Sequence, residues 1–385
     1  MRLLHTADWH LGRLFHGRSL LEDQAHALEG FVSLVADVRP DAVLVAGDIY
    51  DRAVPPFEAV NLLDDVLSRI VLGLGVPVVL IAGNHDSADR LGFGARLLAE
   101  RGLMVAGRLR PGTVDSLTVH DRWGEARIYA VPYAEPALVR EWSGQPAGDH
   151  DAAMGVILDS VRAAHPANTR AVVMAHAFVA GGSESESERP LTVGGSGRVA
   201  PQRFAGFDYV ALGHLHRPQN VGAPHVRYAG SLLKYSLSEV DHPKSVSLVD
   251  VRGPGEVTVE TLVLPVRRDL RVIEGELRTL IEAGASDPLR EDYVFARLHD
   301  RGAVLDPVAR LREIYPNVLG CERTVLTRAR DEQASWSGAV APRDTPTLFA
   351  DFVAEVSGTP LDEAERVIVR EALAALEKQR REDAS

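Results

Sequence analysis

Apolar residues occur along the first two-thirds of this chain in short uninterrupted runs, and between the runs they recur every three or four positions. Uninterrupted runs are typical of strands buried on both faces, and recurring positions are typical of amphipathic helices. Strand-like runs lie at residues 2–6, 42–46, 78–82, 103–105, 127–132, 171–175 and 208–212. The alternation predicts an α/β fold built from β-α-β units with a parallel sheet.

Helices are expected between these strands. Ser19 and Glu22 have the spacing of a capping box ahead of an apolar stripe that ends before Pro40. The two prolines at 55–56 begin the next helix, whose stripe at 60–70 either packs on the sheet or forms a dimer contact. Two more helices are expected at residues 93–101 and 151–163.

The pattern changes in the last third of the chain. Strands at 245–251 and 257–264 are expected to be antiparallel and to complete a second sheet. After Pro265, strand-like runs at 270–274, 293–298 and 318–326 and helical patterns at 276–282 and 307–314 predict a small α+β unit. From Thr345 onward, two amphipathic helices are expected on either side of Gly358 and Pro360. We therefore expect three parts, at residues 1–266, 267–335 and 345–385.

Composition narrows the class of protein. A chain of 385 residues with 45% hydrophobic and 25% charged residues is ordinary for a soluble globular protein of two or three domains. No apolar run is long enough to span a bilayer, and the first residues lack the apolar core of a secretory signal. A single cysteine, Cys321, suits a reducing cytoplasm. These features predict a cytoplasmic protein without a membrane partner.

Candidate metal ligands follow five of the expected strands. They are Asp8 and His10, then Asp48, then Asn84 with His85 and Asp86, then His176, and finally His214 and His216. The carboxyl ends of parallel strands meet at one edge of a sheet, where ligands bind. Imidazole, carboxylate and amide ligands without thiolate favour hard or borderline cations, and two such ions can clamp a phosphate. The pattern indicates phosphoester hydrolysis, with Asp48 as the natural bridge between two ions.

Other histidines lack this context. His5, His120, His225 and His299 are expected to be structural, whereas His16 stays open because it closely follows the first motif.

These motifs resemble those of the calcineurin-like metallophosphoesterase superfamily and, within it, those of the bacterial SbcD nuclease subunits. The resemblance rests on L-H-T-A-D-W-H-L-G-R, A-G-D-I-Y-D, A-G-N-H-D-S, Y-V-A-L-G-H-L-H-R and H-V-R-Y-A-G-S, which span roughly the first two-thirds of the chain. It implies a two-sheet sandwich flanked by helices, a small DNA-facing cap domain and a C-terminal arm that docks on an SbcC-type coiled-coil ATPase. It also implies a homodimer within a heterotetramer.

The same resemblance implies roles for single residues. Asp8, His10, Asp48 and His216 would bind the first metal ion, and Asp48, Asn84, His176 and His214 would bind the second. The family's preference implies Mn²⁺ at both positions. His85 matches the family's catalytic histidine, which is not a ligand and meets the scissile phosphate or the leaving oxygen.

Asp51 departs from the pattern of archaeal and eukaryotic relatives, which carry a second histidine at this position. G-D-I-Y-D-R looks instead like the G-D-x-V-D-R of serine/threonine phosphatases, where the second aspartate supports the catalytic histidine. We expect the Asp51 carboxylate to accept a hydrogen bond from His85. The alternative is that Asp51 caps the helix begun at Pro55 or pairs with Arg52.

Three functions are weighed. The resemblance implies an ATP-regulated DNA nuclease, a 3'-to-5' exonuclease on double-stranded ends and an endonuclease on hairpins and single strands, in DNA repair, recombination and replication. A phosphatase or cyclic-nucleotide phosphodiesterase would use the same metals but would not explain the cap-like unit or the terminal helices. A scaffold without activity is disfavoured by the complete ligand set and His85.

Two features bear on a DNA substrate. The net charge of -12 weakly disfavours DNA, although bound metal and a basic partner could offset it. The stretch from Gly181 to Arg198, rich in glycine, serine and glutamate, is expected to be a mobile loop. Its Arg189 or Arg198 could contact a DNA phosphate, or the loop is a solvated connector. An active nuclease would associate with the nucleoid.

Overall fold

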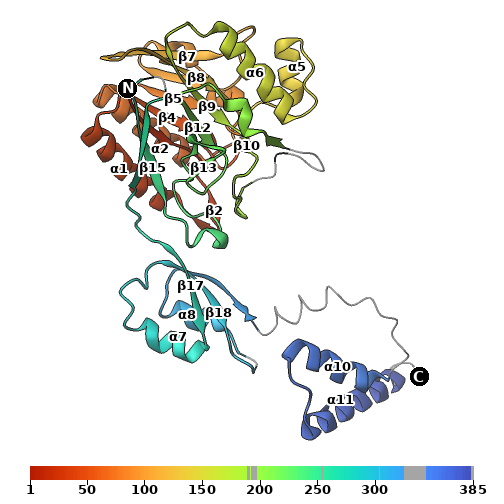
Figure 1. The fold of residues 1–385 in the computed structure, drawn as a ribbon. Helices are drawn as coiled ribbons and strands as arrows, with labels where there is room; N and C mark the ends of the chain where they lie inside the picture. The colour runs from red at the N-terminus through yellow and green to blue at the C-terminus, as the bar shows by residue number, and fades with distance from the viewer. Residues whose placement is uncertain (189–190, 192–196, 254, 303, 325–343, 383–385) are drawn as a thin grey trace. The chain divides into compact units, whose positions relative to one another are not determined.

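The computed structural model describes residues 1–385 except 189–190, 192–196, 254, 303, 325–343 and 383–385. The chain divides into two compact units, Met1–Arg267 and Arg268–Ser385 (Figure 1). Among the described residues, no helix combines the length and hydrophobicity that crossing a membrane requires.

The first unit is a sandwich of two six-stranded sheets. In the first sheet the strand order is β16-β15-β1-β4-β5-β6, and β1, β4, β5 and β6 are parallel. The bounds are β1 Arg2–Thr6, β4 Ala42–Ala46, β5 Val78–Ile81, β6 Leu103–Ala106, β15 Ser245–Val251 and β16 Val257–Val263. The expected parallel sheet is therefore present.

In the second sheet the order is β13-β14-β12-β9-β8-β7, and β8, β9, β12 and β14 are parallel. The bounds are β7 Asp115–Asp121, β8 Gly124–Val131, β9 Arg170–His176, β12 Tyr209–Gly213, β13 Gln219–Val221 and β14 Ala223–Tyr228. Short strands lie outside the two sheets: β2 Leu14–Phe15, β3 Arg18–Ser19, β10 Phe178–Val179 and β11 Arg198–Val199. The expected sandwich is confirmed.

The placement of the late antiparallel strands was wrong. β15 and β16 do pair antiparallel, but β15 joins β1 in the first sheet, with Arg2 opposite Asp250. Val249 and Val251 of β15 pack in the core between the sheets beside Leu3. Alternation within the two strands predicts a hairpin, but it does not say which sheet edge the hairpin extends.

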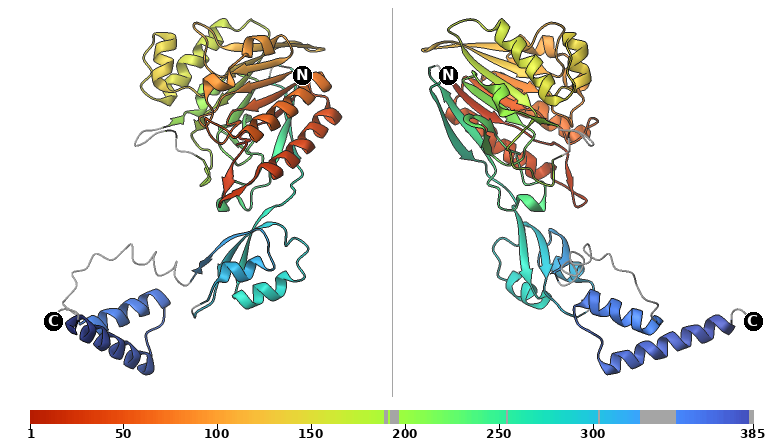
Figure 2. Two further views of the ribbon diagram at one scale, coloured as in Figure 1. Left: turned by 180° about the vertical axis from the view of Figure 1, so that it is seen from behind. Right: turned by 45° about the vertical axis from the view of Figure 1, so that its right-hand side comes forward.

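Helices cover the outer faces of the sandwich (Figure 2). The bounds are α1 Leu21–Val38, α2 Phe57–Ser68, continued by the π-helical turn η1 Arg69–Gly73, α3 Ala88–Leu91, α4 Ala95–Ala99, α5 Pro136–Ser143, α6 His150–Ala164, and the short helices η2 Pro201–Phe204 and η3 Leu237–Glu239. In β4, Leu44 packs between the sheets, so Val43 and Val45 face the opposite side, and all three are fully buried. This explains the uninterrupted apolar run.

The predicted capping box at the start of α1 does not form. Ser19 belongs to β3, and the residue that precedes the helix is Leu20, which makes no side-chain cap. Inside the helix, Leu28, Phe31 and Val35 are buried, as the apolar spacing predicted. The helix ends at Val38, where Arg39 adopts a left-handed conformation before Pro40.

The second unit contains a parallel three-stranded sheet in the order β17-β18-β19. The elements are β17 Leu270–Gly275, α7 Leu277–Gly284, β18 Tyr293–Leu298, α8 Pro307–Arg312 and β19 Val318–Arg323. Its core contains Leu280, Val294, Ala296 and Leu311. Two further helices, α10 Thr345–Ser357 and α11 Glu363–Glu382, follow.

Candidate metal centre

The candidate ligands come together at the carboxyl ends of five strands. Asp8, Asp48 and Asn84 follow the parallel strands β1, β4 and β5 of the first sheet. His176 ends β9, and the last two histidines follow β12, its parallel neighbour in the second sheet. The His176 ring lies 2.9 Å, measured from Nδ1, from the Ala46 carbonyl oxygen of the other sheet. The two sheets therefore present their ligands to one shared space.

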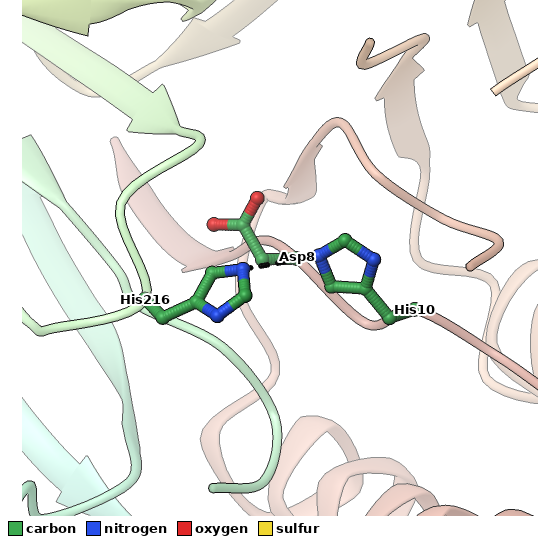
Figure 3. Close-up of side chains that lie close together, drawn as sticks. All are labelled: Asp8, His10 and His216. Carbon is green, nitrogen blue, oxygen red and sulfur yellow. Dashed lines mark hydrogen bonds between the residues drawn. The ribbon is translucent and has the colours of Figure 1, made fainter. Parts of the chain in front are cut away.

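The first ligand group consists of Asp8, His10 and His216, all buried, with potential ligand atoms within 4.8 Å of one another. Figure 3 shows the two imidazole rings with Asp8 beside them. The two Nε2 atoms, of His10 and His216, are 3.1 Å apart. This is the arrangement expected when both rings aim at a common cation.

The second ligand group consists of Asp48, His176 and His214, also buried and within 4.8 Å of one another. Asn84 joins it, because its Oδ1 lies 2.9 Å from Nε2 of His176 and 3.3 Å from Nδ1 of His214.

Asp48 lies between the two groups. Its Oδ2 is 3.5 Å from Nε2 of His176 in the second group and 3.6 Å from Nε2 of His10 in the first. Its Oδ1 accepts a hydrogen bond from the backbone N–H of His85 at 2.9 Å. A carboxylate held in this way can serve two cations at once.

Several of these residues have an unusual backbone. Four of them have a positive φ, which residues other than glycine rarely adopt: 53° at Asp8, 45° at His10, 49° at Asp48 and 112° at His214. Each such residue costs of order 1–3 kcal/mol, and such strain is concentrated at functional sites. Here it turns each side chain from the end of its strand toward the shared space.

Two motif glycines permit the close approach of neighbouring strands. A Cβ atom at Gly83 would lie 2.1 Å from Oδ1 of Asp48, and one at Gly213 would lie 1.8 Å from the carbonyl oxygen of Ala46. Both positions therefore require glycine.

Burial and mutual charge set the protonation of the site. Burial lowers the pKa of His10 and His216, and it lowers the pKa of His214 to about 3. These rings are therefore neutral, with lone pairs available for a metal ion. Burial opposes protonation of His176, but the Asp48 and Asp8 carboxylates outweigh it and raise its pKa to about 9.

The two carboxyl groups respond in opposite directions. Burial, helped by the charge of Asp48, raises the pKa of Asp8 well above its usual range. For Asp48 burial acts in the same sense, but the protonated His176 ring outweighs it and holds the pKa of Asp48 well below the usual range. A bound cation would stabilise the ionised form of the buried Asp8 carboxyl group. It would also accept the lone pairs of the imidazole rings that face it.

The ligand set therefore fits divalent metal ions. It consists of imidazole nitrogens with carboxylate and amide oxygens, which suits hard and borderline cations. In addition, Nδ1 of His10 is buried and has no hydrogen-bond partner among the described residues.

The predicted hydrogen bond between His85 and the Asp51 carboxylate was wrong. Nδ1 of His85 lies 2.9 Å from the backbone carbonyl oxygen of Asp51, while the Asp51 carboxylate pairs with Arg13 at 3.0 Å. The turn after β4 directs the carbonyl group to Nδ1 of His85. The carboxylate stays nearby, with an oxygen within 4.8 Å of ring nitrogens of both His10 and His85, but it makes no hydrogen bond to His85. The other nitrogen of His85, Nε2, lies 4.0 Å from Oδ2 of Asp48. The predicted proximity of the two residues is right, but the interacting group is the main chain.

Four further residues organise the site. Asp86 was expected among the candidate ligands but instead binds backbone groups, and the other three had no predicted role. The Asp86 carboxylate accepts hydrogen bonds from the backbone N–H groups of Ile49, Tyr50 and Gly83 and so joins the two turns. The Gln24 amide donates to the carbonyl groups of Trp9 and His10. Glu239 and Lys244 form a buried ion pair beside His216. Only Asp86 stood in a recognised motif.

The loop after β10 also contacts the site. The Glu188 carboxylate accepts a hydrogen bond from the backbone N–H of His216 at 2.7 Å, and Oγ of Ser187 lies 2.6 Å from Nδ1 of the same histidine. Arg198 lies over the Phe178 ring and pairs with Glu184, while Arg189 is outside the described residues. The expected mobile loop thus has, at 183–188, a segment docked on a candidate ligand.

Two of the remaining histidines, His5 and His16, lie outside both ligand groups. His5 is buried, with its ring nitrogens bonded to the Tyr209 hydroxyl and the Leu212 carbonyl, and burial lowers its pKa to about 3. His16 lies in the turn between β2 and β3 and belongs to neither ligand group.

Two family models match parts of this chain. Residues 1–218 match the family described as calcineurin-like phosphoesterase, and residues 266–357 match the one described as type 5 capsule protein repressor C-terminal domain. Among solved structures, a dimetal phosphatase from Danio rerio is 13% identical with a TM-score of 0.37, covering 69% of this chain and 99% of that one.

Two curated relatives match nearly end to end. The SbcD component of the SbcCD nuclease from Staphylococcus saprophyticus is 31% identical over 384 residues, covering 98% of each chain. That of Staphylococcus epidermidis is 30% identical over 368 residues, covering 95% of this chain and 96% of the relative. The chain belongs to the calcineurin-like phosphoesterases and, among them, to the SbcD family. The predicted family and the predicted class of enzyme, a divalent-metal-binding hydrolase of phosphate esters, are confirmed.

Proposed function

We propose that this protein is the two-metal-dependent DNA nuclease subunit of an SbcCD-type complex. The observation that carries the proposal is the position of Asp48, whose Oδ2 lies 3.6 Å from the nearest nitrogen of one buried ligand group and 3.5 Å from that of the other. Two-metal sites with ions about 3.5–4 Å apart are used to hydrolyse phosphate esters by in-line attack.

The assignment of ligands follows from the two groups. Asp8, His10, Asp48 and His216 would hold the first ion, and Asp48, Asn84, His176 and His214 the second. Mn²⁺ is the proposed metal at both positions. Bound there, the ions would polarise the scissile phosphate and supply a nucleophile at neutral pH.

The protein's own groups have separate tasks in this mechanism. The bond between Nδ1 of His85 and the Asp51 carbonyl requires a proton on Nδ1, because a carbonyl oxygen only accepts. It also fixes the ring so that Nε2 faces Asp48, at the margin of the two ligand groups. From there His85 would meet the scissile phosphate or protonate the leaving oxygen, whereas Asp51 acts through its backbone.

A nuclease is favoured over a phosphatase by the relatives. The two staphylococcal proteins are named as nuclease subunits, and the match extends through the second unit, which a phosphatase of the same fold would not need. We propose 3'-to-5' exonuclease activity on double-stranded ends and endonuclease activity on hairpins and single strands, both regulated by ATP. The alternative function is that of a phosphatase or cyclic-nucleotide phosphodiesterase.

The assembly is proposed in three parts. Residues 1–266 would form the nuclease domain, 267–335 a cap that faces DNA, and 345–385 an arm that docks on the coiled-coil ATPase subunit. Homodimerisation within a heterotetramer is supported by exposed apolar side chains on α2, since Phe57 is 71% and Val60 is 42% exposed. The complex would work in the cytoplasm, at the nucleoid when active, in DNA repair, recombination and replication.

The test is a direct choice between substrates. Purified protein with Mn²⁺ should shorten end-labelled duplex DNA from its 3' ends and cut a hairpin, and it should leave a phosphopeptide and a cyclic nucleotide intact. A chelator added to the same reaction should stop cleavage. Release of phosphate from the phosphopeptide without DNA cleavage would establish the phosphatase instead.

A further inference from the structure

A buried carboxylate outside the strand-end motifs lies behind the His216 ring. Glu239, the last residue of η3, is fully buried. Its Oε1 lies 3.3 Å from Nδ1 of His216, and its Oε2 lies 2.5 Å from Nζ of Lys244. Lys244 also donates to the backbone carbonyl of His216 at 2.9 Å. One buried ion pair therefore contacts both the ring and the main chain of this histidine.

A serine from the loop after β10 lies between these partners. Oγ of Ser187 is 2.6 Å from Nδ1 of His216, and the same hydroxyl donates to Oε1 of Glu239. The neighbouring Glu188 carboxylate accepts from the backbone N–H of His216, so the segment is attached to this residue at two points.

The direction of these hydrogen bonds follows from counting protons. An ionised carboxylate only accepts, and a serine hydroxyl has one proton to donate. Glu239 is ionised, because the Lys244 ammonium group lies 2.5 Å from its Oε2. The Ser187 proton therefore points to Glu239, and the hydroxyl must accept from Nδ1–H of His216. The proton sits on Nδ1, which leaves the lone pair on Nε2, the atom that faces His10.

We propose that Ser187 and Glu239 form a hydrogen-bonded relay that positions His216 for the first metal ion. Occupancy of that site then depends on docking of the 183–188 segment. The inference rests on the proposed metal site and extends it to residues outside the ligand motifs. Partners behind a ligating histidine typically contribute about 10- to 100-fold to metal affinity.

The test measures metal binding rather than activity. Binding of Mn²⁺ to the full-length protein is titrated calorimetrically, and electron paramagnetic resonance distinguishes a coupled pair of ions from an isolated one. Ser187→Ala should weaken one of the two sites by about 10- to 100-fold and leave the other unchanged, so that an isolated-ion signal appears. Ser187→Thr, which keeps the hydroxyl, should restore the coupled pair. Ser183→Ala, an exposed serine of the same loop, is the matched control and should bind like the parent.

Glu239→Gln provides a second test of the relay. It should weaken the same site, and its melting temperature shows whether loss of the Lys244 partner has unfolded the protein. Parental affinity at both sites in Ser187→Ala would overturn the relay alone, as would equal weakening of both sites. A parent protein that binds no Mn²⁺ would overturn the proposed function and the relay together.

Discussion

Asp48 is the residue on which both ligand groups depend. Its φ of 49° turns the side chain out of the strand end, and Gly83 leaves room for its Oδ1. The backbone N–H of His85 then holds that oxygen, so that Oδ2 faces the histidines of both groups. Substitution here should affect two ions, whereas substitution of a terminal ligand should affect one.

Asp48→Asn should accordingly lose more bound Mn²⁺ than His10→Ala. The amide lacks the negative charge that attracts both ions. If its oxygen takes the bridging position, its NH2 group cannot accept the hydrogen bond from the backbone N–H of His85 that positions the side chain. After dialysis against a low concentration of Mn²⁺, elemental analysis should find both ions depleted in Asp48→Asn and mainly one depleted in His10→Ala. Equal stoichiometry in the two variants, with melting temperatures near that of the parent, would refute the bridging assignment.

Substitution of Asp51 should lower the rate of DNA cleavage far less than substitution of His85. Asp51→Asn keeps the backbone carbonyl that accepts from His85, and it removes the negative charge that pairs with Arg13 and lies 3.8 Å from Nδ1 of His10. We expect DNA cleavage by Asp51→Asn within a few-fold of the parent, because a part-exposed ion pair contributes little. His85→Ala should lose about 10²- to 10⁴-fold in kcat while keeping its metal, as expected for a lost proton donor. A loss in Asp51→Asn as large as that in His85→Ala would show that the carboxylate itself is needed.

The clustering of the candidate ligands was predictable from the sequence. Each of them lies at or just after the end of a buried strand, so position in the chain determines location at the sheet edge. The supporting residues were not predictable. Glu239 and Gln24 belong to segments that lack the spacing of a metal-binding motif, and only the folded structure places them beside the site. For Asp51 the sequence predicted proximity to His85, but whether a carboxylate or a carbonyl faces the ring is decided by the turn.

At the scale of elements, the site is made of strand ends and the tight turns that follow them. The turns after β4 and β5 are joined by the Asp86 carboxylate, which accepts from Ile49, Tyr50 and Gly83. The alternation of strands and helices made these elements predictable. The edge that the β15–β16 hairpin joins was not, because pairing with β1 depends on residues at the opposite end of the chain.

Gly83→Ala should disorganise the turn after β5. The added Cβ would lie 2.1 Å from Oδ1 of Asp48 and 2.3 Å from its backbone nitrogen, so the two turns must separate. We expect reduced Mn²⁺ content and at least a ten-fold loss of cleavage. Gly148→Ala is the matched control, because nothing lies within 4 Å of its Cβ position. Normal metal content in Gly83→Ala would mean that the turns can separate without disturbing the ligands.

A partly buried ion pair lies at the other end of β9, away from the candidate ligands. Arg170 is 3% exposed and bonds Asp121 of β7 at 3.0 and 2.5 Å. Burial alone would raise the pKa of Asp121, but Arg170 and the terminal amino group outweigh it and hold the pKa well below the usual range. The pair therefore stabilises the fold wherever Asp121 is ionised.

Asp121→Asn should destabilise the first unit by about 3 kcal/mol at pH 7, because it leaves a buried guanidinium without its charged partner. The folded pKa lies below the unfolded value of about 3.9, so the stabilisation is complete above that value and is lost as the pH falls through the folded pKa. Melting temperatures of variant and parent, measured from pH 7 to pH 3, should stay apart down to about pH 4 and begin to converge only below it. Asp250→Asn, from the more exposed pair with Arg2, is the control and should change stability by less than about 1 kcal/mol.

At the scale of the whole molecule, the candidate metal centre and the proposed docking surface occupy different parts of the chain. Every candidate ligand lies between Asp8 and His216, and no metal-ligand cluster is found in the described residues of the second unit. The helices α10 and α11 instead expose a series of apolar side chains: Leu348, Phe349, Phe352, Val367 and Ile368. Clustered apolar residues that stay exposed indicate a surface for a partner.

Deleting Thr345 to Ser385 should therefore separate assembly from chemistry. The truncated protein should no longer co-purify with the coiled-coil ATPase subunit when the two are co-expressed, because the apolar helical surface is gone. It should still cleave short single strands with Mn²⁺, since every proposed ligand and His85 remain. Phe352→Asp in the full-length chain is the milder variant: this side chain is 57% exposed, so a charge there should weaken docking without unfolding the helix. If the truncated protein still co-purified, the helices would instead pack on their own chain, and the ATPase would have to bind another surface.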